Sequence, residues 1–300
     1  MNFNRWMGIS SVIIAAMLWG TTGTVQALLP ESREPLAVGA MRLLVGAIAL
    51  LAMALAHQPS RRALVRLPWV SVFFAGSSIA CYNLLFFWAV SEAGVGIGTA
   101  VTIGSAPFWA TAYEALSRTA LPTRKRLGGQ IISIIGVAFL GLAAADDGKG
   151  SLGLVLALGA GASYASYSLI TSKIGHKAPS TAIAAGTFSC AALLTLPVLA
   201  VVPIAWVIAP GVWLAIGFLG IVATGLAYAF YTWGLTRVAA SSAVTLALAE
   251  PVTAWLLATV IIKDPVTLTS ATGVGLILVG LIIVARHPSR KLRAELNKDL

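Results

Sequence analysis

The chain has 300 residues, of which 58% are hydrophobic and only 10% are charged. About a quarter of the residues of a soluble protein are charged, so this composition excludes a soluble enzyme or a soluble binding domain. The formal net charge of +10 does not indicate a nucleic-acid partner, because the basic residues lie in short gaps between long apolar segments. The composition therefore predicts an integral membrane protein, whose surrounding partner is membrane lipid.

The apolar residues form ten segments of about 20 residues, which is the length of a helix that crosses a bilayer. Each is predicted to be a helix, because a span must satisfy its backbone hydrogen bonds internally. The first segment resembles a signal peptide, but its length favours a first span. The predicted spans are 7–29, 35–56, 69–91, 95–117, 124–144, 151–172, 180–202, 211–235, 240–261 and 267–285.

The distribution of Lys and Arg predicts how these spans are oriented. One side of the predicted topology has only three basic residues, Arg33, Lys149 and Lys263. The other side has the remaining basic residues of the gaps and those of the tail "RHPSRKLRAELNK". Loops rich in Lys and Arg stay in the cytoplasm, so both termini are predicted to be cytoplasmic.

The chain is predicted to consist of two repeats of five spans each, residues 1–146 and residues 147–300. A shift of 144 positions aligns "GSAPFWA" with "LAEPVTA" and places Gly136 on Gly280. Apolar helices align by chance easily, so the positions of the charged loops are the stronger argument.

The basic loops change sides between the two halves. The basic loop at 57–66 corresponds to an uncharged loop at 202–211, and the acidic loop at 31–34 corresponds to a basic loop at 173–177. An odd number of spans per repeat inverts the second repeat relative to the first. Inverted repeats with a binding site between them are typical of transporters.

These features resemble the drug/metabolite transporter superfamily, EamA type. The resemblance rests on ten spans in two halves, "LWGT" in the first span, Arg42 in the second, and proline-centred fourth and ninth spans. It covers residues 7–286 and is greatest to YddG-type exporters of aromatic amino acids in bacterial inner membranes. It implies an all-α multi-pass membrane protein, with ten transmembrane helices in two inverted five-helix repeats around a central cavity. It also implies alternating access, with spans 1, 3, 4, 6, 8 and 9 lining the cavity and spans 5 and 10 at the periphery.

The stretch "AEPVTAW", residues 249–255, places a carboxylate beside a proline inside the ninth span. Pro251 lacks an N–H group and crowds the preceding turn, so a bend is predicted there, and Pro107 predicts the same in the fourth span. Whether the two prolines act as hinges or as packing kinks is left open. Glu250 is costly in lipid and is therefore predicted to face a cavity. There it binds a substrate amine, carries a proton, or only hydrogen-bonds another helix.

Two further charges lie within the predicted spans. Arg42 pairs with Glu250, binds a substrate carboxylate, or extends towards the membrane interface, and the sequence does not choose among these roles. Glu114 lies near the cytoplasmic end of the fourth span and is expected to form an interfacial ion pair with Arg118.

Aromatic side chains deep in the spans are predicted to form the wall of a substrate cavity. A Tyr hydroxyl is unsatisfied in lipid, so deep tyrosines are expected to face inward, and several of them share a helix face at a spacing of three or four residues. Simple helix packing is the alternative for each of them. The predicted substrate-binding residues are Trp19, Tyr82, Phe86, Ser105, Trp109, Tyr164, Tyr167, Tyr228 and Glu250.

The leading hypothesis is a secondary transporter that exports amino acids, with aromatic and large apolar ones first. The alternatives are an exporter of the same fold for a drug cation or a nucleotide sugar, and a membrane enzyme or scaffold. The sequence has no catalytic motif and no P-loop, which disfavours an enzyme and ATP-driven transport. Cys81 and Cys190 both lie within spans, so neither a disulfide nor a metal site is predicted. No cofactor is expected, and a homo-oligomer is left open.

Overall fold

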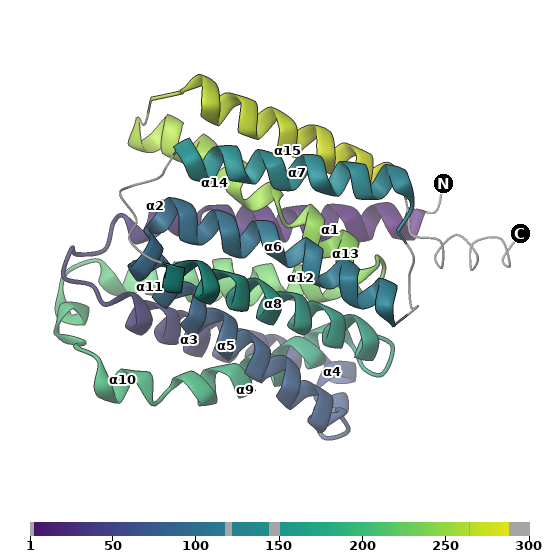
Figure 1. Ribbon diagram of the computed structural model, residues 1–300. Helices are drawn as coiled ribbons and strands as arrows, with labels where there is room; N and C mark the ends of the chain where they lie inside the picture. The colour runs from purple at the N-terminus through teal and green to yellow at the C-terminus, as the bar shows by residue number, and fades with distance from the viewer. Residues whose placement is uncertain (1–2, 118–121, 144–150, 264, 288–300) are drawn as a thin grey trace, which may run out of the picture.

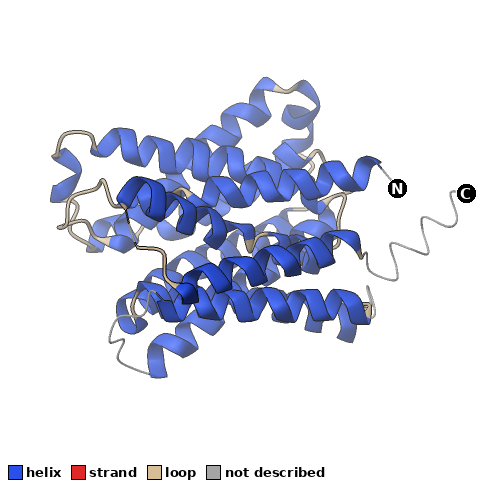
Figure 2. Cartoon of the chain, turned by 90° about the horizontal axis from the view of Figure 1, so that it is seen from above, coloured by secondary structure: helices blue, strands red, loops and turns tan. Residues whose placement is uncertain are grey.

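The computed structural model describes residues 3–117, 122–143, 151–263 and 265–287. Within these ranges the chain forms helices and connecting loops, without strands (Figure 2). Three short elements are not α-helical: η1 (Ala205–Ile208) is a 3-10 helix, and η2 (Ile221–Leu226) and η3 (Ala258–Ile262) are π-helical. The α-helices are α1 (Phe3–Gly20), α2 (Thr22–Gln26), α3 (Pro35–Ala56), α4 (Gln58–Leu64), α5 (Trp69–Ala93), α6 (Val95–Leu116), α7 (Arg124–Ala143), α8 (Ser151–Ile174), α9 (Ser180–Thr195), α10 (Val198–Val201), α11 (Val212–Gly220), α12 (Ala227–Leu235), α13 (Ala240–Leu246), α14 (Ala249–Leu257) and α15 (Leu268–Arg286).

Nine helical segments of the described chain are long and apolar enough to cross a membrane. They correspond to nine of the ten predicted spans. The other predicted span, 95–117, is helix α6, which has 22 residues but is not among these nine. Large apolar side chains such as Phe73, Leu142 and Leu154 are exposed on the outer surface of the bundle. Lipid rather than water is the solvent that suits such a surface.

The first and the ninth predicted spans, which contain Trp19 and Glu250, are each divided into two α-helices. The first is divided at Thr21 into α1 and α2, and the ninth is divided between Leu246 and Ala249 into α13 and α14. The carbonyl oxygen of Ala247, which the missing N–H of Pro251 would have bonded, instead accepts the Glu250 N–H at 2.9 Å. Pro251 therefore lies in the first turn of α14, where a missing N–H group is tolerated.

Pro107 behaves differently, although the sequence predicted the same local effect at both prolines. It is buried inside α6, and the helix continues through it. Helix α6 packs against α5, α7 and α8, and such neighbours stabilise a proline-containing membrane helix. The two prolines are thus not structurally equivalent, because the ninth span is interrupted beside its proline and the fourth span is not.

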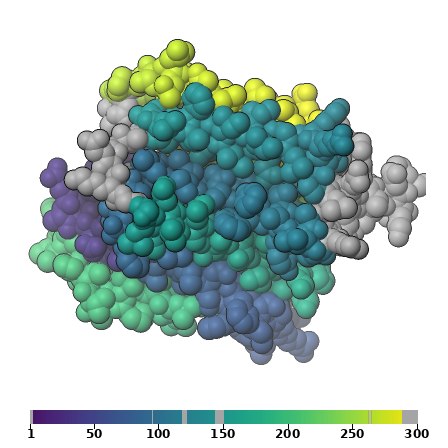
Figure 3. Space-filling view, viewed as in Figure 1, coloured from purple at the N-terminus to yellow at the C-terminus, as the bar shows by residue number. Residues whose placement is uncertain are grey.

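Helices α7 and α15 pack on each other along one edge of the bundle, at the top of Figures 1 and 3. Small residues make this close approach sterically acceptable. A β-carbon at Gly136 would collide with the carbonyl oxygen of Gly273, and one at Gly129 would crowd the carbonyl oxygen of Gly280. Close backbone contact through small residues is a common way for helices to associate in membranes.

The interior of the bundle lies where helices from the two halves of the chain meet. Contacts of this kind join α1 to α12, α3 to α9, and α5 to α8 (Figure 1). The main buried cluster contains residues of all six of these helices, together with residues of α13. Helix α1 begins at the end of the bundle where α15 ends, because Nη2 of Arg5 donates to the carbonyl oxygen of Ala285 at 2.6 Å.

Candidate functional site

A continuous group of aromatic rings fills the space between α1, α5, α8, α9 and α12. Within it, the ring centroids of Trp19 and Tyr228 are 4.7 Å apart, and those of Tyr82 and Tyr164 are 5.5 Å apart. Such separations are typical of interacting aromatic pairs. We call this group the central aromatic cluster; its members are Trp19, Tyr82, Phe86, Tyr164, Tyr167, Phe188, Tyr228 and Tyr231.

The polar atoms of the cluster are only partly satisfied. The Tyr231 hydroxyl lies 2.9 Å from Oγ of Ser168, and the Tyr167 hydroxyl lies 3.3 Å from Oγ1 of Thr232. In contrast, Nε1 of Trp19 is buried without a hydrogen-bond acceptor among the described residues. The Tyr164 hydroxyl lies beside that of Tyr231 but forms no hydrogen bond of normal geometry. Buried donors are nearly always paired in proteins, so these positions suit the polar groups of a ligand.

Glu250 lies beside this cluster, in the first turn of α14. A β-carbon at Gly20 would collide with the carbonyl oxygen of Glu250, so the last residue of α1 is in close contact with the first turn of α14. The charge of Glu250 acts on the hydroxyls of Tyr82, Tyr164 and Tyr228. Interrupted helices that meet next to a buried charge are a recurrent architecture of transporter binding sites.

Arg42, on α3, is the second charge beside the cluster. Its guanidinium acts electrostatically on Glu250, Tyr82 and Tyr228. No salt bridge joins it to Glu250 in the described part of the chain, and its Nε is buried without a hydrogen-bond partner. The cluster is therefore flanked by a carboxylate and a guanidinium that do not directly neutralise each other.

The structure does not bring two of the predicted substrate-binding residues to the cluster. Ser105 faces α8, where a β-carbon at Gly161 would collide with its Oγ. Trp109 is 37% exposed, and its ring lies 5.4 Å from that of Phe108, centroid to centroid. The physical reason is that α6 packs chiefly against α5, α7, α8 and α13, and the side chains of α6 that cluster with Tyr164 are those of Ala106 and Ala110. A role for either residue in binding substrate stays a prediction.

Two members of the cluster were missed by the sequence analysis. Tyr231 is three residues after Tyr228, a spacing that places both side chains on one face of α12, so the sequence did contain a signal for it. Phe188 is an isolated aromatic residue in an Ala-rich span, and nothing in the sequence distinguishes it from a lipid-facing one.

A second polar group, which we call the basic-end network, joins α6, α7 and α13 through Glu114, Arg126 and Ser241. The Ser241 N–H donates to Oε1 of Glu114 at 3.1 Å, and its hydroxyl donates to Oε2. Nη2 of Arg126 donates to the Ser241 hydroxyl and lies 3.8 Å from Oε2 of Glu114. The sequence predicted an interfacial position for Glu114. In the structure its side chain is instead buried in a contact between three helices. Its predicted partner Arg118 lies outside the described residues.

These observations define a class of protein: a multi-pass membrane transporter with a buried polar and aromatic site. The chain belongs to the EamA-like transporter family, whose model matches residues 6–142 and again residues 151–286. Members of this family are transporters and not enzymes, and the predicted membership is confirmed. The narrower similarity to YddG-type exporters stays a prediction.

The relatives agree with this assignment. The chain is 41% identical over 289 residues to a Bacillus subtilis (strain 168) protein described as "Uncharacterized transporter YwfM", and the match covers 95% of each chain. A solved structure titled "Crystal structure of protein" superposes with a TM-score of 0.79, covering 93% of this chain and 97% of the other. Its sequence identity is 22%, so this likeness establishes the fold alone.

Proposed function

We propose that this protein is a secondary transporter that exports amino acids with aromatic or large apolar side chains by alternating access. The observation that carries the proposal is the placement of Glu250 and Arg42 beside the central aromatic cluster. An amino acid has a cationic amine and an anionic carboxylate, and these two residues supply the complementary charges. The rings supply apolar and stacking contacts for the side chain.

The proposed site lies between two inverted five-helix repeats, residues 1–146 and 147–300, and contacts at the α7–α15 edge support this arrangement. Gly136 and Gly280 are 144 positions apart, as are Gly129 and Gly273. Gly136 packs on Gly273, and Gly129 packs on Gly280, so exchanging the halves converts one contact into the other. A two-fold axis in the membrane plane generates such reciprocal pairs.

A residue that lies on such an axis should contact the residue at the corresponding position of the other repeat. Oγ of Ser133 lies 3.5 Å from the carbonyl oxygen of Ile277, and these two residues are themselves 144 positions apart. This contact lies between the two glycine pairs along α7 and α15, as a local two-fold axis requires.

A contact elsewhere in the bundle supports the same symmetry. A β-carbon at Gly76 would collide with Cys190, and one at Gly220 would collide with Val45 and approach Gly46. Gly76 and Gly220 are 144 positions apart, as are Gly46 and Cys190. Ten spans in this arrangement, with α6 as the fourth, place both chain ends on one side. The excess of Lys and Arg makes that side the cytoplasm of a bacterial inner membrane.

The runner-up is an exporter of organic cations with the same fold. Glu250 would attract a cation, but Arg42 lies close enough to act on the same carboxylate and would repel it. A substrate with both charges suits this pair better than a substrate with one, because each charge then has a complementary partner.

The proposal is tested with purified protein in proteoliposomes, by measuring uptake of labelled phenylalanine. Unlabelled tryptophan and phenylalanine should compete. Phenethylamine and phenylpropionate, which each lack one of the two charges, should compete poorly. Protein-free liposomes provide the background. If an organic cation competes and tryptophan and phenylalanine do not, the runner-up replaces the proposal.

A further inference from the structure

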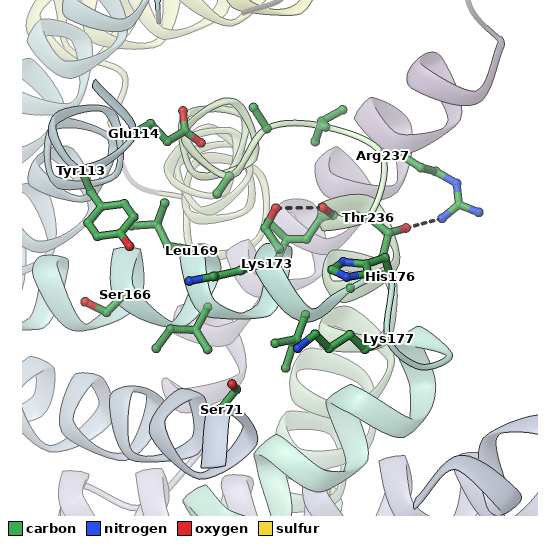
Figure 4. A pocket seen from close by; sticks show the side chains of 18 of the residues that line it. Ser71, Tyr113, Glu114, Ser166, Leu169, Lys173, His176, Lys177, Thr236 and Arg237 are labelled. Atoms are coloured by element: carbon green, nitrogen blue, oxygen red, sulfur yellow. Dashed lines mark hydrogen bonds between the residues drawn. The ribbon is translucent and has the colours of Figure 1, made fainter. Parts of the chain in front are cut away.

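A pocket of about 1080 Å³ opens at the end of the bundle where α5 begins and α6 and α8 end. Its walls come from these three helices, from the loop between α8 and α9, and from the loop between α12 and α13 (Figure 4). This is the end that contains the excess of Lys and Arg. The pocket is lined by neither Trp19 nor Glu250, so it is separate from the central aromatic cluster.

Two lysine side chains line the pocket. They belong to Lys173 and Lys177, and neither side chain has a hydrogen bond or salt bridge to another described residue. Figure 4 shows the Lys173 side chain extending into the space between Tyr113 and Ser71, with Lys177 directed towards the same space. The carboxylate of Glu114, at the pocket wall, is already engaged by Ser241 and Arg126.

The third basic side chain at the pocket is used differently. The Arg237 guanidinium lies 3.4 Å from the ring centroid of Trp233 and donates to that residue's carbonyl oxygen at 3.0 Å. It also donates to Oγ1 of Thr236 at 2.6 Å, and in Figure 4 it points away from the lysines. Lys173 and Lys177 are therefore the cations available to a ligand in this pocket.

The side wall of the pocket is apolar and reaches the outer surface of the bundle. Phe74 on α5 is 58% exposed and Tyr113 on α6 is 51% exposed. Leu169 and Ile170 of α8 continue the wall inward. An apolar wall does not contribute to the binding of a small free anion. It can contact the acyl chain of a lipid whose charged headgroup lies at the basic residues.

We propose that this pocket binds an anionic phospholipid from the leaflet on the basic side, with its phosphate at Lys173 and Lys177 and an acyl chain along Phe74 and Tyr113. Basic pockets between transmembrane helices at this depth suit the headgroups of anionic lipids. This proposal does not depend on which substrate the protein transports. It therefore remains valid if the central aromatic cluster has another role than the one proposed above.

The test uses the full-length protein in nanodiscs of phosphatidylcholine that contain a small fraction of phosphatidylglycerol, followed by mass spectrometry of the lipids that remain bound after purification in detergent. The protein should retain phosphatidylglycerol in preference to phosphatidylcholine. The double variant Lys173→Gln/Lys177→Gln should lose about 30-fold in affinity for phosphatidylglycerol, because each lysine near a membrane surface contributes roughly a factor of five. The control Arg61→Gln/Arg62→Gln removes two exposed cations of α4, which do not line the pocket, and should retain the lipid.

Three results would overturn the proposal. Equal retention of the two lipids would show that the pocket has no preference for an anionic headgroup. An equal loss in the α4 control would assign the effect to general surface charge. Displacement of phosphatidylglycerol by millimolar inorganic phosphate, with no effect of Phe74→Asn on retention, would show a free-anion site instead of a lipid site. A circular dichroism spectrum like that of the wild type ensures that each variant is folded.

Discussion

Replacing Glu114 with Gln should destabilise the protein far more than the loss of a surface charge would. Arg126 is 1% exposed and Glu114 is 5% exposed. Gln has the size of Glu, and its carbonyl oxygen can still accept the Ser241 N–H, which is 3.1 Å from Oε1 in the native protein. The substitution therefore removes a negative charge beside a buried guanidinium, which cannot lose its proton in compensation.

The expected loss follows from the geometry of the basic-end network. Removing one partner of a buried ion pair costs about 3–5 kcal/mol. Because Nη2 of Arg126 lies 3.8 Å from the carboxylate and Ser241 bridges the two groups, we expect the lower end, about 3 kcal/mol. The double variant Glu114→Gln/Arg126→Met should recover most of this loss. An apolar side chain of similar length often replaces a buried ion pair without net cost.

The assay is reversible unfolding in mixed micelles, in which the mole fraction of denaturing detergent is increased and helix content is followed by circular dichroism. Glu92→Gln is the matched control, because Glu92 accepts a hydrogen bond from Trp88 at 3.2 Å on an exposed helix face. Its loss should change stability by less than about 1 kcal/mol. The reasoning is refuted if Glu114→Gln unfolds at the same mole fraction of denaturing detergent as Glu92→Gln. It is also refuted if the double variant is less stable than Glu114→Gln alone.

Further outcomes follow from the same contacts. Tyr82→Ala removes two ring contacts of the central aromatic cluster and should weaken substrate binding about tenfold; unchanged competition by tryptophan in proteoliposomes containing a folded variant would contradict a role of this ring in binding. Gly136→Ala should destabilise the protein by about 1–3 kcal/mol through overpacking of α7 on α15, in the same unfolding assay. Gly128→Ala, in open space on the same helix, should instead stabilise it by roughly 0.5–1 kcal/mol, and a loss equal to that of Gly136→Ala would refute the packing. A reporter fused to the C-terminus should be active only in the cytoplasm, and activity in the periplasm would reverse the topology.

The helical membrane fold was predictable because it depends on local properties of the chain. A run of about 20 apolar residues has few alternatives in lipid to a spanning helix. Helix α6 is the least apolar case, since Thr102, Ser105 and Pro107 interrupt its apolar sequence. The break at Thr21 was not predicted, because no proline lies in this part of the first span to indicate it.

The candidate site was predictable only within single helices. Tyr82 and Phe86 share a face of α5 as their spacing requires, and their rings lie 5.9 Å apart. Contacts between helices depend on how each helix is rotated and crossed, which spacing does not give. This is why the sequence did not indicate Phe188 as a member of the cluster. It is also why Arg126, counted among the loop charges that set topology, was not expected to be fully buried.

The central claim is that Glu250 acts on substrate or protons at the central aromatic cluster. The measurement is the initial rate of phenylalanine transport in proteoliposomes, as a function of pH, for the wild type and for Glu250→Gln, with Glu92→Gln as the control. Gln retains the shape and hydrogen bonding of Glu250 but not its charge. A lost charge-assisted contact should lower transport about tenfold or more, or flatten its pH dependence, while the protein stays folded. Normal transport by Glu250→Gln at every pH would contradict the account and leave this acid as a packing element.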